Sequence, residues 1–455
     1  MPTSIDRPLR ICLLSYRSNQ YCGGQGVYIQ KLSRALHDLG HRVTVVSGPP
    51  LPRLDPGIRL HCLQGLDLYN PDALFRLPSL RELSDPLNLW EWVGVSTMGF
   101  PEPFVFGIRA YRFLRRRLHR FDVFHDNQGL SYGLWAIQRR APTVATIHHP
   151  ITVDRDLAVA NVAATWEKLK QLRWYSFVWM QQRVARTLPQ IITVSQRSRD
   201  DISREFALPQ SRFRIVPNGV DTVQFRPRPE IERRPGRILV TSSADVPLKG
   251  MRFLLEAVAS LAPERSIRLV VVGPARKDGA VRAAIRRLGI EDRVSFTGTI
   301  DAEEIVRQYA RASMAVTPSL YEGFGLPVIE AMACGVPVIS TTGGALPEVV
   351  GDAGLLVPPG DSRALAQAML FLHDNPAAAA ELGRRGYRRV RRRFTWRKTA
   401  ESTVAVYREA IFDHRGSRQA ADQTAPAGSG YRLRLWSPCL PCIPSPGRPD
   451  RRGRP

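Results

Sequence analysis

The feature that most restricts the fold of this chain is an alternation of short apolar segments with segments of helical pattern. Residues 10–15 and 42–47 are runs rich in Val, Leu and Ile, and residues 27–39 between them carry apolar side chains at helical spacing. Gly40 follows as a glycine that ends the helix. Such a unit forms two parallel strands joined by a right-handed crossover. We therefore expect an α/β protein whose ligands bind at the carboxyl ends of parallel strands.

The alternation occurs twice along the chain. Residues 226–237, rich in Pro, Arg and Glu, separate the two series and have the composition of an interdomain linker. Residues 51–103 fit neither a strand nor a helix pattern well. Further strands are expected at residues 142–147, 190–194, 238–241, 269–272, 294–296, 314–317 and 336–339.

The sequence predicts two α/β domains followed by a tail. With 455 residues, the chain can build two separate cores, which we place at residues 1–225 and 238–395. After about Ala410 the periodicity gives way to Gly, Pro, Arg and Ser, so residues 413–455 are expected to be a disordered basic tail.

Composition indicates a protein without membrane spans. The hydrophobic content is 44%, and no window approaches the ~20 apolar residues that cross a bilayer. Residues 1–10 do not resemble a signal peptide, so we expect a cytoplasmic protein.

Six scattered cysteines argue against a disulfide framework, and the Cys439–Cys442 pair is interpreted as incidental. Four aromatic residues of the long helical stretch are assigned to core or interhelical packing: Trp166, Trp174, Phe177 and Trp179.

The formal net charge of +24 needs an explanation. Part of it comes from an arginine-rich helix at residues 384–393, and part from the tail. Residues 111–121 interleave apolar and basic side chains at near-helical spacing, as segments on anionic membrane surfaces do. For each cluster taken alone, a solvated helix face is the favoured explanation. Because no nucleic-acid-binding motif accompanies the charge, we rank a membrane surface above nucleic acid as a partner, with the protein peripheral at the inner face.

Two carboxylates frame the most suggestive motif. Glu322 and Glu330 enclose Gly323, Gly325 and Pro327, and an apolar helical run follows. The proline suits a first helical turn, and the glycines allow backbone N–H groups to approach a ligand. A helix N-terminus favours phosphate, and two carboxylates accept hydroxyl protons, so a sugar joined to a nucleotide diphosphate would match. For the isolated pair, a helix-capping acid and a solvated acid remain the simpler alternative.

Weaker motifs lie at other strand ends. The glycine loop at residues 23–26 follows the first strand, where a phosphate cradle or a plain tight turn would fit. Lys249 starts a helix, an electrostatically poor position that a bound diphosphate would neutralise. His148 ends a strand, as crevice-facing histidines do. Asp154 and Asp156 form a D-x-D, which we interpret as a salt-bridged loop, and no metal site is predicted.

Taken together, these motifs resemble the retaining glycosyltransferases of family 4, which have the GT-B architecture of two Rossmann-like domains. The resemblance covers about residues 10–408. It rests on an ordered set of matches: Gly23-Gly24, His148, Ser195, residues 217–221, Lys249-Gly250, Val272-Gly273, residues 296–298, the 322–330 block, Gly343-Gly344, Pro347-Glu348 and residues 357–361. It implies that residues 396–412 form a helix that crosses back to the first domain.

The resemblance also implies roles for individual residues. Lys249 would bind the donor diphosphate, Glu330 the ribose hydroxyls and Glu322 the transferred sugar. His148 would hydrogen-bond the donor sugar and, with Lys249 and Glu322, make up the catalytic set. The remaining donor contacts would come from Gly23, Gly24, Gly273, Gly323, Phe324, Gly325 and Leu326.

The implied reaction moves a hexosyl unit from a nucleotide-diphosphate sugar to an acceptor hydroxyl, with retention and without an obligatory cofactor or metal. The acceptor is not identified by the sequence. One position departs from the family pattern: Ala244 stands where an arginine usually provides a second diphosphate contact. The alternatives are a sugar-nucleotide epimerase or hydrolase with this fold, and an inactive binding protein.

Overall fold

The computed structural model describes residues 7–18, 24–68, 76–160, 162–241, 245–261, 265–274, 276 and 279–424, with side chains described up to residue 417. Gly23, Ala244 and the Cys439–Cys442 pair therefore lie outside the described residues, as does the chain from residue 425.

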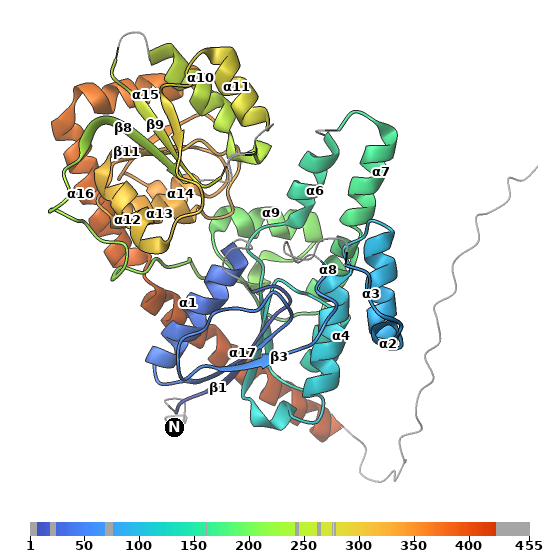
Figure 1. Cartoon of the computed structure of the whole chain (residues 1–455). Coiled ribbons are helices and arrows are strands. Elements are labelled where there is room, and N and C mark those ends of the chain that lie inside the picture. Colours follow the sequence, from blue (N-terminus) through green and yellow to red (C-terminus); the bar gives the residue numbers. More distant parts are fainter. Residues whose placement is uncertain are drawn as a thin grey trace, which may run out of the picture. The chain divides into compact units, whose positions relative to one another are not determined.

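A parallel sheet forms the centre of the first domain (Figure 1). In the described part of the chain it has seven strands in the order β3-β2-β1-β4-β5-β6-β7, all paired in parallel. The order reverses direction between β1 and β4, which makes their carboxyl ends a switch point where α/β sheets bind ligands. The strands are β1 (Arg10–Ser15), β2 (Arg42–Ser47), β3 (Arg59–Cys62), β4 (Val123–Asn127), β5 (Thr143–Thr146), β6 (Ile191–Thr193) and β7 (Phe213–Ile215).

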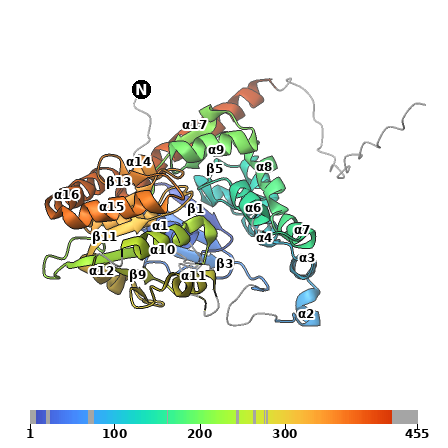
Figure 2. The ribbon, with the colours of Figure 1, turned by 90° about the horizontal axis from the view of Figure 1, so that it is seen from above.

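Helices cover both faces of this sheet and bury two apolar clusters. β1 is almost wholly buried because both of its faces lie under helices, as the continuous apolar run requires. α6 and α7 form a helical hairpin, visible beside α3 and α8 in Figures 1 and 2. The helices are α1 (Gly24–Asp38), α2 (Leu80–Leu83), α3 (Pro86–Ser96), α4 (Glu102–Leu114), α5 (Tyr132–Gln138), α6 (Ile151–Ala160), α7 (Thr165–Trp174), α8 (Phe177–Ala185) and α9 (Gln196–Phe206), with short 3-10 turns at Leu118–Arg120 and Gln210–Arg212.

Several local predictions for this domain need correction. Gly24 and Gly26 belong to the first turn of α1 and not to a preceding loop. The predicted core packing is wrong for Trp166 and Trp179, which are 60% and 62% exposed. In residues 111–121 the apolar side chains pack against the core and only the basic ones face solvent. This segment can therefore offer charge to an anionic surface but no apolar side chains to insert.

The second domain repeats the architecture. Its sheet, within the described residues, has six parallel strands in the order β10-β9-β8-β11-β12-β13. The strands are β8 (Arg234–Thr241), β9 (Arg268–Val272), β10 (Val294–Phe296), β11 (Ala312–Thr317), β12 (Val338–Thr341) and β13 (Leu355–Val357). The helices are α10 (Met251–Leu261), α11 (Ala280–Leu288), α12 (Ala302–Arg311), α13 (Leu326–Ala333), α14 (Leu346–Val350), α15 (Ser362–Asp374) and α16 (Pro376–Arg393), with the 3-10 turn η5 (Pro247–Lys249).

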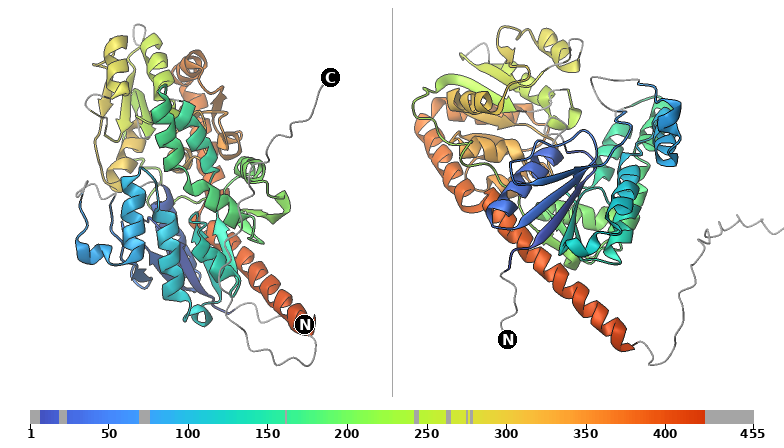
Figure 3. Two further views of the ribbon diagram at one scale, coloured as in Figure 1. Left: turned by 90° about the vertical axis from the view of Figure 1, so that its right-hand side faces the viewer. Right: turned by 60° about the horizontal axis from the view of Figure 1, so that its bottom comes forward.

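The last helix, α17 (Trp396–Thr424), packs under the first sheet (Figure 3). Its Trp396 and Tyr407 are buried in the same apolar cluster as Leu9 and Ile11. The helix continues past the boundary expected near Ala410, so the periodicity ends later than the sequence suggested. No described helix is long and apolar enough to cross a bilayer.

A buried hydrogen bond fixes α17 to the sheet. The Tyr407 hydroxyl lies 2.5 Å from His125 Nδ1, and both side chains are at most 1% exposed. Tyr407→Phe would leave an unpaired buried imidazole nitrogen. We expect the free energy of unfolding to fall by about 1–3 kcal/mol, measured by urea denaturation.

Phe412→Ala is the matched control on the same helix. Phe412 is 72% exposed, so its loss should change the unfolding free energy by less than about 0.5 kcal/mol. An equal effect of both substitutions would contradict the anchoring role of Tyr407.

Candidate active site

The loop between β11 and α13 holds Glu322 in a fixed backbone position. Gly325 has a φ of 100°, a conformation that glycine adopts without strain, and Pro327 follows in the first turn of α13. Gly344 lies directly against the loop: a Cβ there would sit 2.2 Å from the Glu322 carbonyl oxygen. The Ala345 N–H donates to that same oxygen at 2.8 Å. The backbone of Glu322 is therefore held by the segment that follows β12.

Lys249 and Glu322 form an ion pair in a small cavity. Lys249 Nζ lies 2.7 Å from Glu322 Oε1, and Ser319 Oγ donates to the same oxygen at 2.8 Å. The Lys249 and Glu322 side chains are 30% and 13% exposed, so a ligand can reach them. The cavity, of about 210 Å³, is lined by Val240, Thr241, Lys249, Thr317, Pro318, Ser319, Glu322 and Pro327.

Glu330 lies on α13, close behind this cavity. Its Oε2 lies 3.4 Å from the hydroxyl of buried Tyr309, which in turn is 2.9 Å from Thr241 Oγ1. Burial raises the pKa of Glu330 to about 7, and the Tyr309 hydrogen bond and the charge of Lys31 only partly oppose that shift. The carboxyl group therefore titrates near neutral pH.

His148, just after β5, is held as a neutral ring of defined tautomer. Asn127 Nδ2 donates to the Gln25 carbonyl oxygen at 3.3 Å, which turns Asn127 Oδ1 toward His148 Nε2 at 2.9 Å. Since that oxygen only accepts, His148 Nε2 carries the proton and Nδ1 is the acceptor. Burial lowers the pKa of His148 to about 3, so the ring is uncharged at neutral pH. The edge-on ring of Tyr28, 4.7 Å away, fixes its orientation.

Backbone contacts bring the first-domain residues to the Glu322 loop. A Cβ on Gly323 would lie 2.9 Å from the His148 carbonyl oxygen, and one on Gly24 would lie 3.8 Å from Leu326 Cδ1. His148, Gly24 and the 323–326 amides thus border one space. Gly273 follows β9, where it pairs with Gly298 and donates its N–H to Thr297 Oγ1 at 3.2 Å.

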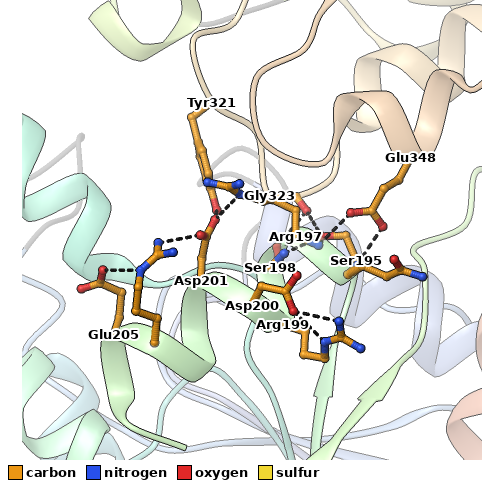
Figure 4. A network of polar contacts seen from close by, with 12 residues as sticks. Ser195, Arg197, Ser198, Arg199, Asp200, Asp201, Glu205, Tyr321, Gly323 and Glu348 are labelled. Atoms are coloured by element: carbon orange, nitrogen blue, oxygen red, sulfur yellow. Dashed lines mark hydrogen bonds and ion pairs between the residues drawn. The ribbon is translucent and has the colours of Figure 1, made fainter. Parts of the chain in front are cut away.

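A polar network joins α9 to the second domain (Figure 4). Ser195 Oγ and Ser198 Oγ each lie 3.0 Å from the Gly323 carbonyl oxygen. The Glu348 carboxylate accepts the N–H groups of Gln196 and Arg197, at 2.8 and 2.7 Å, at the positive end of α9. Tyr321 donates to Asp201 at 2.9 Å.

This network determines where one backbone amide points. In a trans peptide the C=O and the following N–H point in opposite directions. Because the Gly323 carbonyl faces the two serines, the Phe324 N–H is directed away from α9.

Sequence reasoning missed Ser198, Tyr321 and Asn127. A usable signal existed for Ser198, since Ser195 is the N-cap of α9 and accepts from its N–H at 2.9 Å.

The D-x-D residues lie on α6, a helix and not the predicted loop. Asp154 pairs with His149 at 2.7 Å and Asp156 with Arg155 at 2.7 Å. Across the residues that the structure describes, no group of three or more His, Cys, Asp or Glu side chains is arranged to hold a metal ion.

The two parallel-sheet domains and the strand-end residues define a glycosyltransferase of the GT-B fold. Residues 22–224 match the family model described as Glycosyltransferase Family 4, and residues 235–375 match the model described as Glycosyl transferases group 1. The chain belongs to glycosyltransferase family 4, whose members use nucleotide-sugar donors.

Relatives agree with this assignment. The chain is 47% identical over 408 residues to the MMP alpha-(1→4)-mannosyltransferase of Mycolicibacterium hassiacum, covering 89% of this chain and 98% of the relative. It is 28% identical over 442 residues to the D-inositol 3-phosphate glycosyltransferase of Saccharomonospora viridis, covering 90% and 96%.

Solved structures share the fold. Sucrose-phosphate synthase from Thermosynechococcus elongatus aligns with a TM-score of 0.69 at 24% identity, over 89% of this chain and 100% of that one. Anabaena Alr3699/HepE in complex with UDP and glucose aligns with a TM-score of 0.63 at 18% identity, over 88% and 99%.

The orientation of the Phe324 amide can be tested through Ser198. Ser198 Oγ lies 3.0 Å from both the Gly323 and the His148 carbonyl oxygens. Ser198→Ala removes the hydroxyl proton that these two carbonyls share, a change of about 0.5–1.5 kcal/mol. We expect the donor KM to rise about 2- to 10-fold with little change in kcat, measured by steady-state kinetics, because donor and transition state lose the contact alike.

Ser198→Thr keeps a hydroxyl and should restore part of the donor KM. Ser260→Ala is the matched control, since its hydroxyl donates to the Ala257 carbonyl oxygen of its own helix at 2.8 Å. A donor KM that is unchanged in Ser198→Ala would remove this serine from the description of donor binding.

Proposed function

We propose that this glycosyltransferase moves a mannosyl unit, with retention, from a nucleoside-diphosphate mannose to the 4-hydroxyl of a sugar acceptor. The observation that carries the proposal is the half-buried Lys249–Glu322 pair beside the space bordered by His148, Gly24 and Gly323. Mannose and the α-(1→4) linkage are inferred from the printed name of the 47% identical relative. Transfer is favoured over epimerisation, hydrolysis or binding alone because the relatives reported above are transferases.

Each part of the donor has a partner in the proposed complex. Lys249 neutralises the diphosphate, and the amides of Phe324, Gly325 and Leu326 at the N-terminus of α13 donate to it. Gly24 approaches from the first domain, and Gly273 borders the nucleotide side; Gly23, outside the described residues, stays a predicted contact. Glu330 accepts from the ribose hydroxyls, and Glu322 from the transferred sugar.

Charge is redistributed in the proposed reaction step. The bond between the anomeric carbon and the diphosphate oxygen breaks, and the acceptor oxygen bonds to the same face of that carbon. The acceptor proton passes to the departing phosphate oxygen, so no protein nucleophile is needed. Lys249 stabilises the developing negative charge. His148 is neutral, so it orients a sugar hydroxyl through Nδ1 and does not act as an acid.

Cytoplasmic location and peripheral contact with an anionic membrane stay predictions. The cytoplasmic prediction rests on the lack of resemblance of residues 1–10 to a signal peptide. The membrane prediction rests on the exposed basic side chains of residues 111–121 and on the net charge.

Loss of the lysine tests the reaction directly. Lys249→Ala should lower kcat/KM for the donor by about 10²- to 10³-fold, because a charge that stabilises the transition state is removed. The measurement is release of nucleoside diphosphate from a panel of nucleotide-linked mannose and glucose donors, with product linkage determined by NMR.

Arg252→Ala on the adjacent helix α10 is the control, since Arg252 is 72% exposed and forms its ion pair with Glu256 of the same helix. Its activity should match that of the unmodified enzyme. Normal turnover by a folded Lys249→Ala enzyme would exclude the proposed role.

Donor binding should depend on pH through Glu330. The ionised carboxylate accepts two hydroxyl protons, whereas the protonated acid accepts less well. Since its pKa is raised to about 7, the donor KM should rise as pH falls from 8 to 6. Glu330→Gln should have a higher donor KM that is nearly flat over this range. A steep profile that persists in Glu330→Gln would assign the titration to another group.

A further inference from the structure

A groove in the first domain is lined by aromatic side chains that the donor site does not use. It has a volume of about 210 Å³ and lies between α3, the start of α4, α5 and α8. We call it the aromatic groove and define it by Trp90, Phe104, Tyr132, Arg173, Phe177 and Trp179. Trp90 and Trp179 are 59% and 62% exposed, although apolar rings of this size are ordinarily covered.

We propose that this groove binds the acceptor as an extended glycan, with sugar rings stacked on Trp90 and Trp179. This inference rests on the function proposed above. One face of a pyranose presents C–H groups that pack on the flat face of an indole. Its hydroxyls project from the ring edge and need hydrogen-bond partners.

The groove supplies both kinds of contact. Trp90 and Phe104 stand 6.1 Å apart between ring centroids, and Phe104 meets Tyr132 edge-on at 6.3 Å, so the rings form a continuous wall. Exposed Arg173 lies at the rim, where it donates to the hydroxyls of Ser176 and Thr97 at 3.0 Å each. Within the described residues it contacts no carboxylate, and its guanidinium can donate to sugar hydroxyls as well.

The position of the groove connects it to the reaction centre. Tyr132 starts the helix that follows β4, and Phe100 on the groove wall packs edge-on against Tyr16, which follows β1. The carboxyl ends of β1 and β4 form the switch point of the first sheet, where α/β proteins bind ligands. A glycan in the groove therefore leads toward His148 and the start of α1.

A strained turn links the groove wall to His148. Gln128 and Leu130 are buried non-glycine residues with φ values of 55° and 46°, a conformation that residues with a Cβ rarely adopt. Gln181 of α8 holds this turn by donating to the Gln128 carbonyl oxygen at 2.9 Å. Gln128 Oε1 in turn accepts the His148 N–H at 3.0 Å. Such strain is retained where a precise geometry is needed, here between the acceptor wall and the sugar-binding histidine.

The glycan is favoured over a lipid surface or a second protein by the shape and chemistry of the groove. It is concave, whereas apolar side chains that enter a membrane project outward. Acyl chains would remove water from the charged Arg173 guanidinium and from the Tyr132 hydroxyl without offering either a hydrogen-bond partner. The groove also adjoins the site at which the acceptor hydroxyl has to react.

The test uses the full-length enzyme and α-(1→4)-linked mannosides of one to five units. For the unmodified enzyme, the acceptor KM should fall as the chain lengthens. In Trp90→Ala and Trp179→Ala the ratio of the monosaccharide KM to the pentasaccharide KM should drop at least 5-fold. Trp179→Phe should recover part of this ratio because it keeps an aromatic face. A ratio unchanged in both alanine variants would overturn the proposal.

Trp166→Ala is the matched control, because Trp166 is 60% exposed on α7 but does not line the groove. It should keep the length dependence of the unmodified enzyme. A direct readout is quenching of tryptophan fluorescence by the pentasaccharide without donor, which should weaken in Trp179→Ala and persist in Trp166→Ala.

The outcomes separate this inference from the proposed function. If the enzyme transfers mannose but its acceptor KM does not depend on acceptor length, glycan binding in the groove is contradicted and the proposed function is not. Absence of mannosyl transfer to any acceptor contradicts the proposed function, while the quenching assay still reports on the groove. Two further results would contradict glycan binding by the groove. If Trp90→Ala and Trp179→Ala keep their acceptor KM values but no longer float with anionic vesicles, the groove binds a membrane. If they keep these KM values but lose a dimer in size-exclusion chromatography, it binds a second copy of the chain.

Discussion

The contact on which the site depends is the hydrogen bonding of the Gly323 carbonyl oxygen to two serines of the other domain. Any Cβ at this position would lie 2.9 Å from the His148 carbonyl oxygen, so only glycine lets the two backbones approach this closely. The contact sets the direction of the Phe324 amide and brings His148 beside the Glu322 loop. The geometry of the donor site is therefore a property of both domains, although Lys249, Glu322 and Glu330 belong to one.

Pairing and burial set the charges of the donor site before the donor arrives. Lys249 is balanced by Glu322, and His148 is kept neutral by burial. Glu330 titrates near neutrality because burial opposes its charge while Tyr309 and Lys31 favour it. An incoming diphosphate thus meets one mobile cation and oriented amides, which is the preorganised environment that electrostatic catalysis requires.

The sequence predicted the strands built from continuous apolar runs, such as β1 and β2. His148 follows β5 and Glu322 lies on the loop after β11, whereas Lys249 ends the 3-10 turn η5 and does not start a helix as expected. The sequence did not reveal β4, because in Val123–Asn127 only the first two residues are apolar and the rest are His125, Asp126 and Asn127, polar groups buried by tertiary contacts. The exposed tryptophans were misassigned for the opposite reason: aromatic residues at helical spacing give the same pattern whether they face a core or a ligand.

The pairing of Val220 with Thr395 has a consequence for motion. The chain passes between the domains twice, once after Val220 and once before α17, and the Val220 N–H donates to the Phe394 carbonyl oxygen at 2.9 Å. The two interdomain segments, joined by this hydrogen bond, form a single hinge region. We therefore expect the domains to move relative to each other by hinge rotation at this point rather than by sliding. Such a rotation would separate Glu348 from the start of α9, and Ser195 and Ser198 from the Gly323 carbonyl oxygen, while the Val220–Phe394 hydrogen bond stays in place.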